Sequence, residues 1–208
     1  MKATRVWDLP TRVFHWTLVL MFIFAFLTSE DDHWALLHVT AGYTIGGLLI
    51  FRVIWGFAGT RHALFSDFLK RPSEVICYLR GLACGADHAC VGHNPAGGIS
   101  ILLLLLSGLG ATLSGILIYE DVDWPMLEEI HEGASNLMLL LVALHIFGVG
   151  ASSLVHRQNL VTSMITGMKP QHAGAVSVAR HRKLGIILGL GVIAFWVWSL
   201  KDKLHSLI

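Results

Sequence analysis

The stretch "HEGASNLMLLLVALHIFGVG", residues 131–150, holds two histidines in one apolar segment. His131 stands among acidic residues at its start, and His145 follows fourteen residues later among leucines. On an α-helix, fourteen residues return to within ~40° of the starting direction and rise ~21 Å. We therefore expect both side chains on one helix face at two depths. A histidine deep in an apolar helix indicates a functional group, because its burial in lipid is costly.

The whole chain has the composition of a membrane protein. Of its 208 residues, 54% are hydrophobic and 14% are charged, whereas a soluble domain carries about 25% charged residues. The formal net charge is +1 with histidine neutral. Such a small charge provides no field of the kind that attracts nucleic acid.

Five apolar segments are long enough to cross a bilayer as helices, which takes about 20 residues. They cover approximately residues 11–28, 34–57, 96–119, 132–155 and 184–200. The last ends in "FWVWSL", whose tryptophans are typical of anchors at a membrane interface. We predict an all-α integral membrane protein, with a four-helix transmembrane bundle in residues 1–170. Residues 171–208 are expected to form a linker and a fifth, C-terminal transmembrane helix.

Charge alternates between the loops. The stretches "SEDDHW" (29–34) and "EDVDWPMLEEIHE" (120–132) contain acids and no lysine or arginine. The N-terminal tail and the other two loops hold the basic residues, namely Lys2, Arg5, Arg12, Arg61, Lys70, Arg71, Arg80, Arg157, Lys169, Arg180, Arg182 and Lys183. The positive-inside rule then predicts a cytoplasmic N-terminus, acidic loops outside and, after five crossings, a C-terminus outside.

Two further histidines match the depths of the first pair. His15, in "RVFHW" (12–16), lies near the cytoplasmic end of the first segment, and His38 lies near the outer end of the second. Axial side chains hold a b-type haem without covalent attachment, and two histidines from facing helices can sandwich one. We therefore predict a di-haem bundle. The iron ligands are expected to be His15 with His145 on the cytoplasmic side and His38 with His131 on the outer side.

Other interpretations of the histidines stay open. A membrane histidine can also serve as a hydrogen-bonding group between helices, and four of them could form the proton relay of a haem-free transporter. His33, five residues before His38, would point ~140° away from it and is expected at the rim. His93 and His156 are candidates for another role at the cytoplasmic edge. The remaining histidines are expected to be exposed to solvent, namely His62, His88, His172, His181 and His205.

Small residues follow the ligand candidates at helical spacing. Gly42 and Gly46 lie one and two turns after His38, and Gly148 follows His145. A missing side chain lets either a porphyrin face or a neighbouring helix come close.

Two more groups of small residues lie outside the ligand-bearing segments. Ser114 and Gly115 belong to the third segment, which has no ligand candidate, so we expect them to serve helix packing. Gly185 and Gly189 in the fifth segment form a G-x-x-x-G pattern, a weak indication of a dimer face. A homodimer is therefore one option.

Four stretches resemble the bacterial cytochrome b561 family, which includes the b-type cytochrome subunits of nickel–iron hydrogenases. They are "VWDLPTRVFHW" (6–16), "LLHVTAGYTIGGLLIFRVIWGF" (36–57), "GHNPAGG" (92–98) and "HEGASNLMLLLVALHIFGV" (131–149). The resemblance implies a four-helix, di-haem cytochrome of the bacterial inner membrane that exchanges electrons with quinone and a redox partner. It carries the family's haem ligands onto His15, His38, His131 and His145. The fifth segment is an addition to the four helices of the shortest family members.

The resemblance also assigns a role to Arg12. An arginine at the interface can pair with a haem propionate through two hydrogen bonds, and Arg5 and Arg52 lie near the same face. The alternative is that these charges only set the topology.

The leading functional hypothesis is electron transfer between the membrane quinone pool and a periplasmic redox protein. Nine of the fourteen acids lie in the two outer loops, and such a patch would attract a basic c-type cytochrome. One alternative is a superoxide:quinone oxidoreductase, which the acidic outer surface disfavours. Another is the membrane anchor of a larger oxidoreductase such as a hydrogenase. His93, His156 and Arg157 are candidates for a quinone site.

Overall fold

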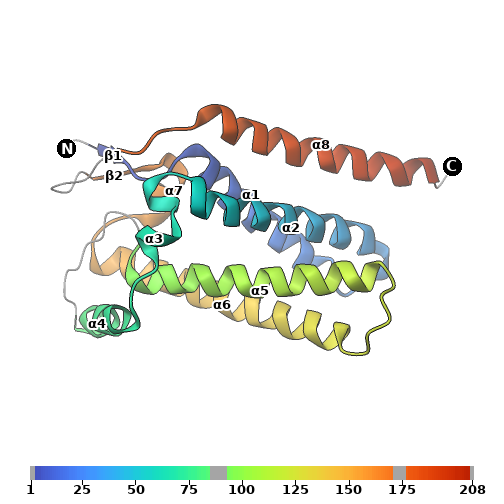
Figure 1. Ribbon diagram of the computed structural model, residues 1–208, viewed down its shortest axis with the longest axis horizontal. Coiled ribbons are helices and arrows are strands. Elements are labelled where there is room, and N and C mark those ends of the chain that lie inside the picture. The colour runs from blue at the N-terminus through green and yellow to red at the C-terminus, as the bar shows by residue number, and fades with distance from the viewer. Residues whose placement is uncertain (1–2, 85–92, 171–176, 207–208) are drawn as a thin grey trace.

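Five long helices form the body of the protein. The computed structural model describes residues 3–84, 93–170 and 177–206. Within these ranges five helices are long and apolar enough to cross a membrane, namely α1 (Leu9–Leu27), α2 (Ala35–Ala58), α5 (Pro95–Tyr119), α6 (Leu127–Val155) and α8 (Arg182–Ser206). They run side by side along the long axis of the molecule (Figure 1). The predicted all-α membrane fold is confirmed.

Short elements cover the ends of the long helices. A 3₁₀ turn, η1 (Asp32–Trp34), connects α1 to α2. The other short elements gather at the opposite end (Figure 1), namely η2 (Arg61–Ala63), α3 (Phe65–Phe68), α4 (Pro72–Ala83), α7 (Leu160–Thr166), β1 (Ala3–Arg5) and β2 (Met168–Pro170). Figure 1 shows α4 end-on, so this helix lies across the direction of the spanning helices.

The helix boundaries follow from local sequence signals. Asp8 caps α1 by accepting a hydrogen bond from the Thr11 backbone N–H at 2.7 Å, and Asn94 caps α5 through the Gly97 N–H at 2.6 Å. In both helices a proline occupies the first turn, where its missing N–H costs nothing.

The predicted start of the fourth segment was wrong by more than a full turn. α6 begins at Leu127 rather than near residue 132, because a turn closed by the Leu127 N–H and the Trp124 carbonyl at 3.1 Å starts the helix early. Glu128 and Glu129 therefore lie in the first helical turn, where negative charge is favoured by the helix dipole. Part of the predicted acidic loop is thus helical.

The long helices pack in a chain of neighbours. α1 packs on α2 and α8, α2 packs on α5, and α5 packs on α6. Among the described spanning helices, α5 is the only one against which α6 makes extensive contact. A core of Met21, Ile45, Leu49 and Leu105 lies between α1, α2 and α5. The close approach of α2 and α5 requires Gly46, where an added Cβ would lie 2.7 Å from the Thr112 Cγ2.

The fifth helix is part of this packing. An added Cβ at Gly185 would lie 2.6 Å from the Leu9 Cγ, and one at Gly189 would lie 3.8 Å from Val13. The G-x-x-x-G pattern therefore packs on α1 of the same chain and is not left open for a second copy. Polar contacts to α2 add to this, because Trp196 Nε1 donates to Thr44 Oγ1 at 3.0 Å. The division of the chain at residue 170 stays a prediction.

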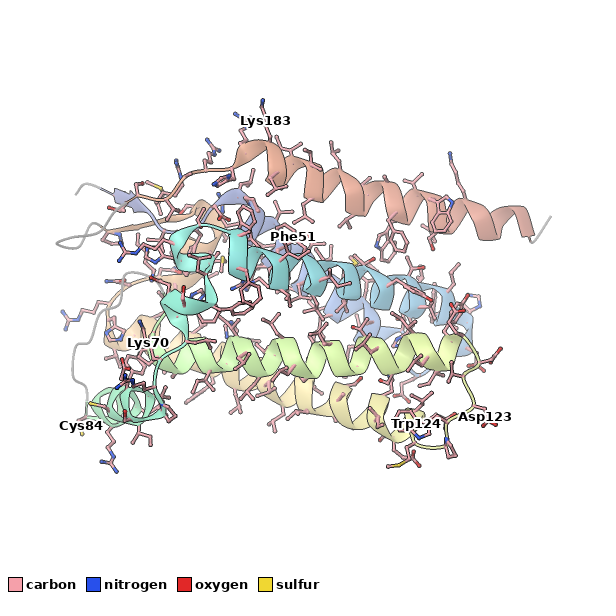
Figure 2. All side chains as sticks on the ribbon, in the orientation of Figure 1. Phe51, Lys70, Cys84, Asp123, Trp124 and Lys183 are labelled. Atoms are coloured by element: carbon pink, nitrogen blue, oxygen red, sulfur yellow. The ribbon has the colours of Figure 1, made fainter. Side chains whose placement is uncertain are left out.

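The two ends of the bundle differ in charge. Figure 2 shows Lys70 and Cys84 at one end, and Asp123 and Trp124 at the other, in the loop between α5 and α6. The outer faces of the long helices carry exposed apolar side chains such as Leu113. Such a surface suits a hydrocarbon environment, and the chain is a multi-pass membrane protein.

Candidate functional site

Two histidines from α2 and α6 meet at the acidic end of the bundle. The ring centroids of His38 and His131 lie 6.1 Å apart, with an angle of 71° between the ring planes. Metal–imidazole bonds are about 2 Å long, so two imidazoles that share one metal ion have ring centres no more than about 6 Å apart. The separation of His38 and His131 would therefore suit a metal ion held between the two rings.

Backbone carbonyls fix the orientation of both rings. His38 Nδ1 lies 2.9 Å from the Ala25 carbonyl oxygen of α1, and His131 Nδ1 lies 2.8 Å from the Ala111 carbonyl oxygen of α5. A carbonyl can only accept, so Nδ1 carries a proton in both rings, and in the neutral form of such a ring Nε2 has the lone pair that a metal needs. Histidines that bind metals are held in this way, with the second ring nitrogen donating to a carbonyl or carboxylate.

Helix α5 positions His131, although it offers no ligand of its own. Ser114 Oγ lies 3.4 Å from His131 Nδ1. An added Cβ at Gly115 would lie 2.8 Å from His131 Cε1. The sequence predicted a packing role for these two residues and missed their contact with a candidate ligand. That contact becomes visible only when the register of α5 against α6 is known.

The second pair, His15 and His145, lies at the basic end of the bundle. His15 on α1 is within electrostatic range of His145 on α6. His15 packs edge-on against Trp16, with 5.0 Å between the ring centroids. Within the described residues its Nδ1 atom is buried and has no hydrogen-bond partner. A buried nitrogen without a partner is unusual in a protein, and in this respect His15 differs from His38 and His131, whose Nδ1 atoms donate to carbonyls.

The glycines near these histidines differ in their surroundings. Added Cβ atoms at Gly42 and Gly148 would meet no atom within 4 Å, whereas Gly46 is needed for helix packing. Gly42 lies one turn from His38 and Gly148 lies three residues after His145. Gly42 is partly buried, so the space beside it lies within the bundle, whereas Gly148 is exposed and its open side faces the surroundings.

Arg12, predicted to pair with a propionate, contacts the backbone of α7. Its Nε donates to the Met164 carbonyl at 3.3 Å, and its Nη2 donates to the carbonyl of Ile165. Trp16 Nε1 reaches the same Met164 carbonyl at 3.4 Å. Arg12 thus helps to hold the end of α7, and its role toward a haem stays a prediction.

His93 lies in an aromatic cluster at the basic end of the bundle. Its ring centroid is 4.5 Å from that of Trp7 and 5.0 Å from that of Phe68. Burial lowers the pKa of His93 well below its usual value, and the positive charges of Arg52 and Lys169 act in the same direction. The imidazole is therefore neutral at physiological pH.

The predicted exposure of His62 was wrong. This residue is 6% exposed, and its Nδ1 lies 2.9 Å from Asp67 Oδ2. The turn η2 folds the chain back, so that a carboxylate five residues later reaches the ring. His181 is exposed as predicted, and His33 is exposed on η1. His88, His172 and the His205 side chain lie outside the described residues.

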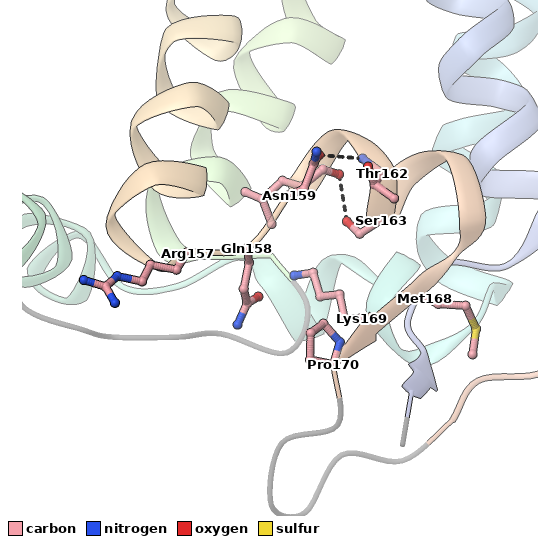
Figure 3. Close-up of a pocket in the computed structure, with 9 residues that line it drawn as sticks. Arg157, Gln158, Asn159, Thr162, Ser163, Met168, Lys169 and Pro170 are labelled. Atoms are coloured by element: carbon pink, nitrogen blue, oxygen red, sulfur yellow. Dashed lines mark hydrogen bonds between the residues drawn. The ribbon is translucent and has the colours of Figure 1, made fainter. Parts of the chain in front are cut away.

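The three candidates for a quinone site have different surroundings. His93 is enclosed by aromatic rings, and His156 Nε2 lies 3.3 Å from the Tyr78 hydroxyl. Arg157 lines a pocket of about 240 Å³ between the end of α6 and β2 (Figure 3). Asn159 lines the same pocket and caps α7 by accepting from the Thr162 N–H at 2.8 Å. These surroundings do not define one quinone site.

Comparison with known proteins agrees with this geometry. The family model described as prokaryotic cytochrome b561 matches residues 6–167. A relative from Rhizobium leguminosarum bv. viciae is 24% identical, over 80% of this chain and 88% of its own length. One from Cupriavidus necator is 23% identical, over 81% and 87%. Both are described as probable Ni/Fe-hydrogenase B-type cytochrome subunits.

No solved structure matches the chain. The family match covers most of the sequence, including all four candidate haem ligands. Proteins of this family are b-type cytochromes, which implies haem b as the cofactor. The chain is a membrane-embedded b-type cytochrome and belongs to the prokaryotic cytochrome b561 family.

Proposed function

We propose that this cytochrome carries electrons across the membrane through two haems. His38 and His131 would hold the outer haem, and His15 and His145 the inner one. The observation that carries the proposal is the His38–His131 pair, 6.1 Å apart, with both Nδ1 atoms directed at backbone carbonyls. Haem iron supplies the reversible one-electron chemistry. The polypeptide orients the imidazoles and surrounds them with apolar helices.

The proposed electron partners are membrane quinone and a periplasmic redox protein. The acidic outer end would attract a basic partner such as a c-type cytochrome over long range. This part of the proposal predicts that the association rate falls as ionic strength rises, because salt screens exposed charges. A rate that does not depend on salt would exclude electrostatic docking at the acidic end.

A count of haem per chain tests the di-haem assignment. A pyridine haemochrome assay with protein quantitation should give two haems per chain. His131→Ala and His145→Ala should each remove one haem. His33→Ala is the matched control and should retain both, because His33 is exposed and lies on η1 outside the bundle. One haem in the wild-type protein, or retention of both haems in His131→Ala, would refute the pairing.

We also propose the bacterial inner membrane as the location, with the acidic end in the periplasm. Cys77 and Cys84 are exposed at the basic end and serve as reporters. A maleimide that cannot cross membranes should label them in inverted vesicles and not in intact spheroplasts. Labelling in spheroplasts alone would reverse the proposed orientation.

A second candidate function is that of a membrane subunit in a larger oxidoreductase. The relatives described as hydrogenase cytochrome subunits favour it. In this case the acidic end would hold a peripheral subunit stably instead of meeting a diffusing protein. Purification in mild detergent distinguishes the two candidates, because a stable subunit would co-purify in stoichiometric amount and a diffusing partner would not.

A further inference from the structure

Arg52 lies at the level of the inner haem site and on the face of α2 that carries His38. The two residues are fourteen positions apart, as are His131 and His145 on α6. This spacing returns to the same helix face to within ~40° after a rise of ~21 Å. Since His38 faces His131, ideal helix geometry directs Arg52 to within ~40° of that side of α2, ~21 Å further along the helix, where its guanidinium lies against α3.

The guanidinium of Arg52 is buried among aromatic rings. The residue is 3% exposed, and its Cζ lies 5.4 Å from the ring centroids of both Phe65 and Phe68. In the described part of the chain its Nη1 atom has no hydrogen-bond partner, and no carboxylate forms a salt bridge with it. A buried charge without a counterion is strongly unfavourable. The structure therefore indicates a negative partner that the described residues do not supply.

Asp8 is not that partner. Its Oδ1 accepts from the Thr11 N–H at 2.7 Å, and its Oδ2 accepts from Trp55 Nε1 at 3.0 Å and from the Thr60 hydroxyl at 2.6 Å. Both oxygens are thus engaged in holding the start of α1 against the end of α2. The attraction between Asp8 and Arg52 acts only at longer range.

His93 connects Arg52 to the inner ligand pair. Phe68 contacts both residues, with its ring 5.0 Å from that of His93 and 5.4 Å from the Arg52 Cζ. The Nδ1 atom of His93 is buried and has no partner among the described residues. His93 is within electrostatic range of both Arg52 and His145. Two buried polar groups without partners therefore lie together beside the inner site.

We propose that Arg52, with His93 beside it, binds a propionate of the inner haem. This inference rests on the proposed di-haem function. A propionate is a carboxylate, and the planar guanidinium binds a carboxylate through two parallel hydrogen bonds. A phospholipid phosphate does not fit as well, because Arg52 is covered by α3 and does not lie on the lipid-exposed surface. Arg12, the residue that the sequence favoured, already donates to the carbonyls of α7.

Two variants of Arg52 test this inference. Arg52→Gln removes the charge, and Arg52→Lys keeps it while removing the paired hydrogen bonds. Arg80→Gln on α4 is the matched control, because Arg80 is an exposed arginine at the same end of the bundle. Each purified protein is examined by pyridine haemochrome assay, by redox titration and by resonance Raman spectroscopy of the propionate bending modes. His145→Ala identifies which signals belong to the inner haem.

The proposal predicts a defect confined to the inner haem. Arg52→Gln should either lose that haem or lower its midpoint potential, because a nearby positive charge stabilises the reduced state. Arg52→Lys should recover part of the loss and still shift the propionate bands. Arg80→Gln should match the wild type. Unchanged haem content, potential and propionate bands in both Arg52 variants would overturn the assignment of Arg52 and leave the di-haem proposal intact. Absence of the inner haem from the wild-type protein would overturn both.

Discussion

The substitution Gly115→Ala tests how His131, the proposed ligand of the outer haem, is oriented. The added Cβ would lie 2.8 Å from Cε1 and 3.0 Å from Nδ1 of His131. Ordinary van der Waals contact begins at 3.4 Å, so the ring must move by about 0.6 Å. Distances to a bound metal are kept within about 0.2 Å of their ideal values. The ring therefore cannot make this movement and keep both its iron bond and its hydrogen bond to the Ala111 carbonyl.

The expected loss follows from the hydrogen bond at His131 Nδ1. Removal of such a partner of a metal ligand typically costs 10–100-fold in metal affinity, or about 1.4–2.8 kcal/mol. Without haem the His131 side chain is free to rotate away from the new methyl group. Gly115→Ala should therefore weaken haem binding at the outer site and leave the stability of the haem-free protein nearly unchanged.

Haem transfer to an excess of a strong haem-binding protein measures this loss. Gly110→Ala is the matched control on the same helix, because its Cβ would lie 3.5 Å from the Ala134 Cβ, an ordinary contact. The outer haem should leave Gly115→Ala 10–100-fold more readily than it leaves Gly110→Ala or the wild type, while the inner haem is retained equally in all three. Equal retention of the outer haem in Gly115→Ala would refute the argument from the ring position.

Three further outcomes are expected. Gly185→Ala should separate α8 from α1 and lower the free energy of unfolding in detergent by about 1–3 kcal/mol. Gly189→Ala, with its Cβ 3.8 Å from Val13, should leave the stability unchanged. Equal stability of the two variants would contradict the packing argument. Asp8→Asn should lower the free energy of unfolding by about 1.5–3 kcal/mol. The asparagine amide is neutral and one of its two polar atoms is a donor, so it replaces the three hydrogen bonds of the buried carboxylate poorly. Unchanged stability would show that the three bonds contribute little. In the haem-free chain the pKa of His93 is lower than its usual value, so the stabilising contribution of His93 is complete above pH about 6.5 and declines as the pH falls below it. Between pH 7.5 and 5.5, the haem-free His93→Phe variant should therefore lose less thermal stability than the haem-free wild-type protein.

The sequence predicted the spanning helices and the positions of the histidines on them because both depend on local patterns. Segment length and hydropathy identify a spanning helix without any tertiary information. The spacing of His131 and His145 places them on one face because helical geometry is regular. The pairing of His38 with His131 followed from matched depths, and the structure brings these two rings together.

The environment of the site could not be predicted in the same way. The acceptors for the two Nδ1 atoms are the backbone carbonyls of Ala25 and Ala111, and a carbonyl has no side-chain signature. The importance of Gly115 depends on the register of α5 against α6. In the sequence Arg12 and Arg52 are both arginines near the cytoplasmic face, and only tertiary burial separates them.

The pairing of β1 with β2 has a consequence for how the protein is assembled. Ala3 pairs with Pro170, and the Val6 N–H donates to the Gly167 carbonyl at 2.9 Å. During synthesis β1 leaves the ribosome long before β2 exists, so the basic ends of α1 and α6 are not tied together until the first four spanning helices have been made. Under the proposed di-haem function, the porphyrins have an interval in which to enter between the helices before this ribbon closes, and a chain that cannot form it should acquire its cofactors readily but release them early.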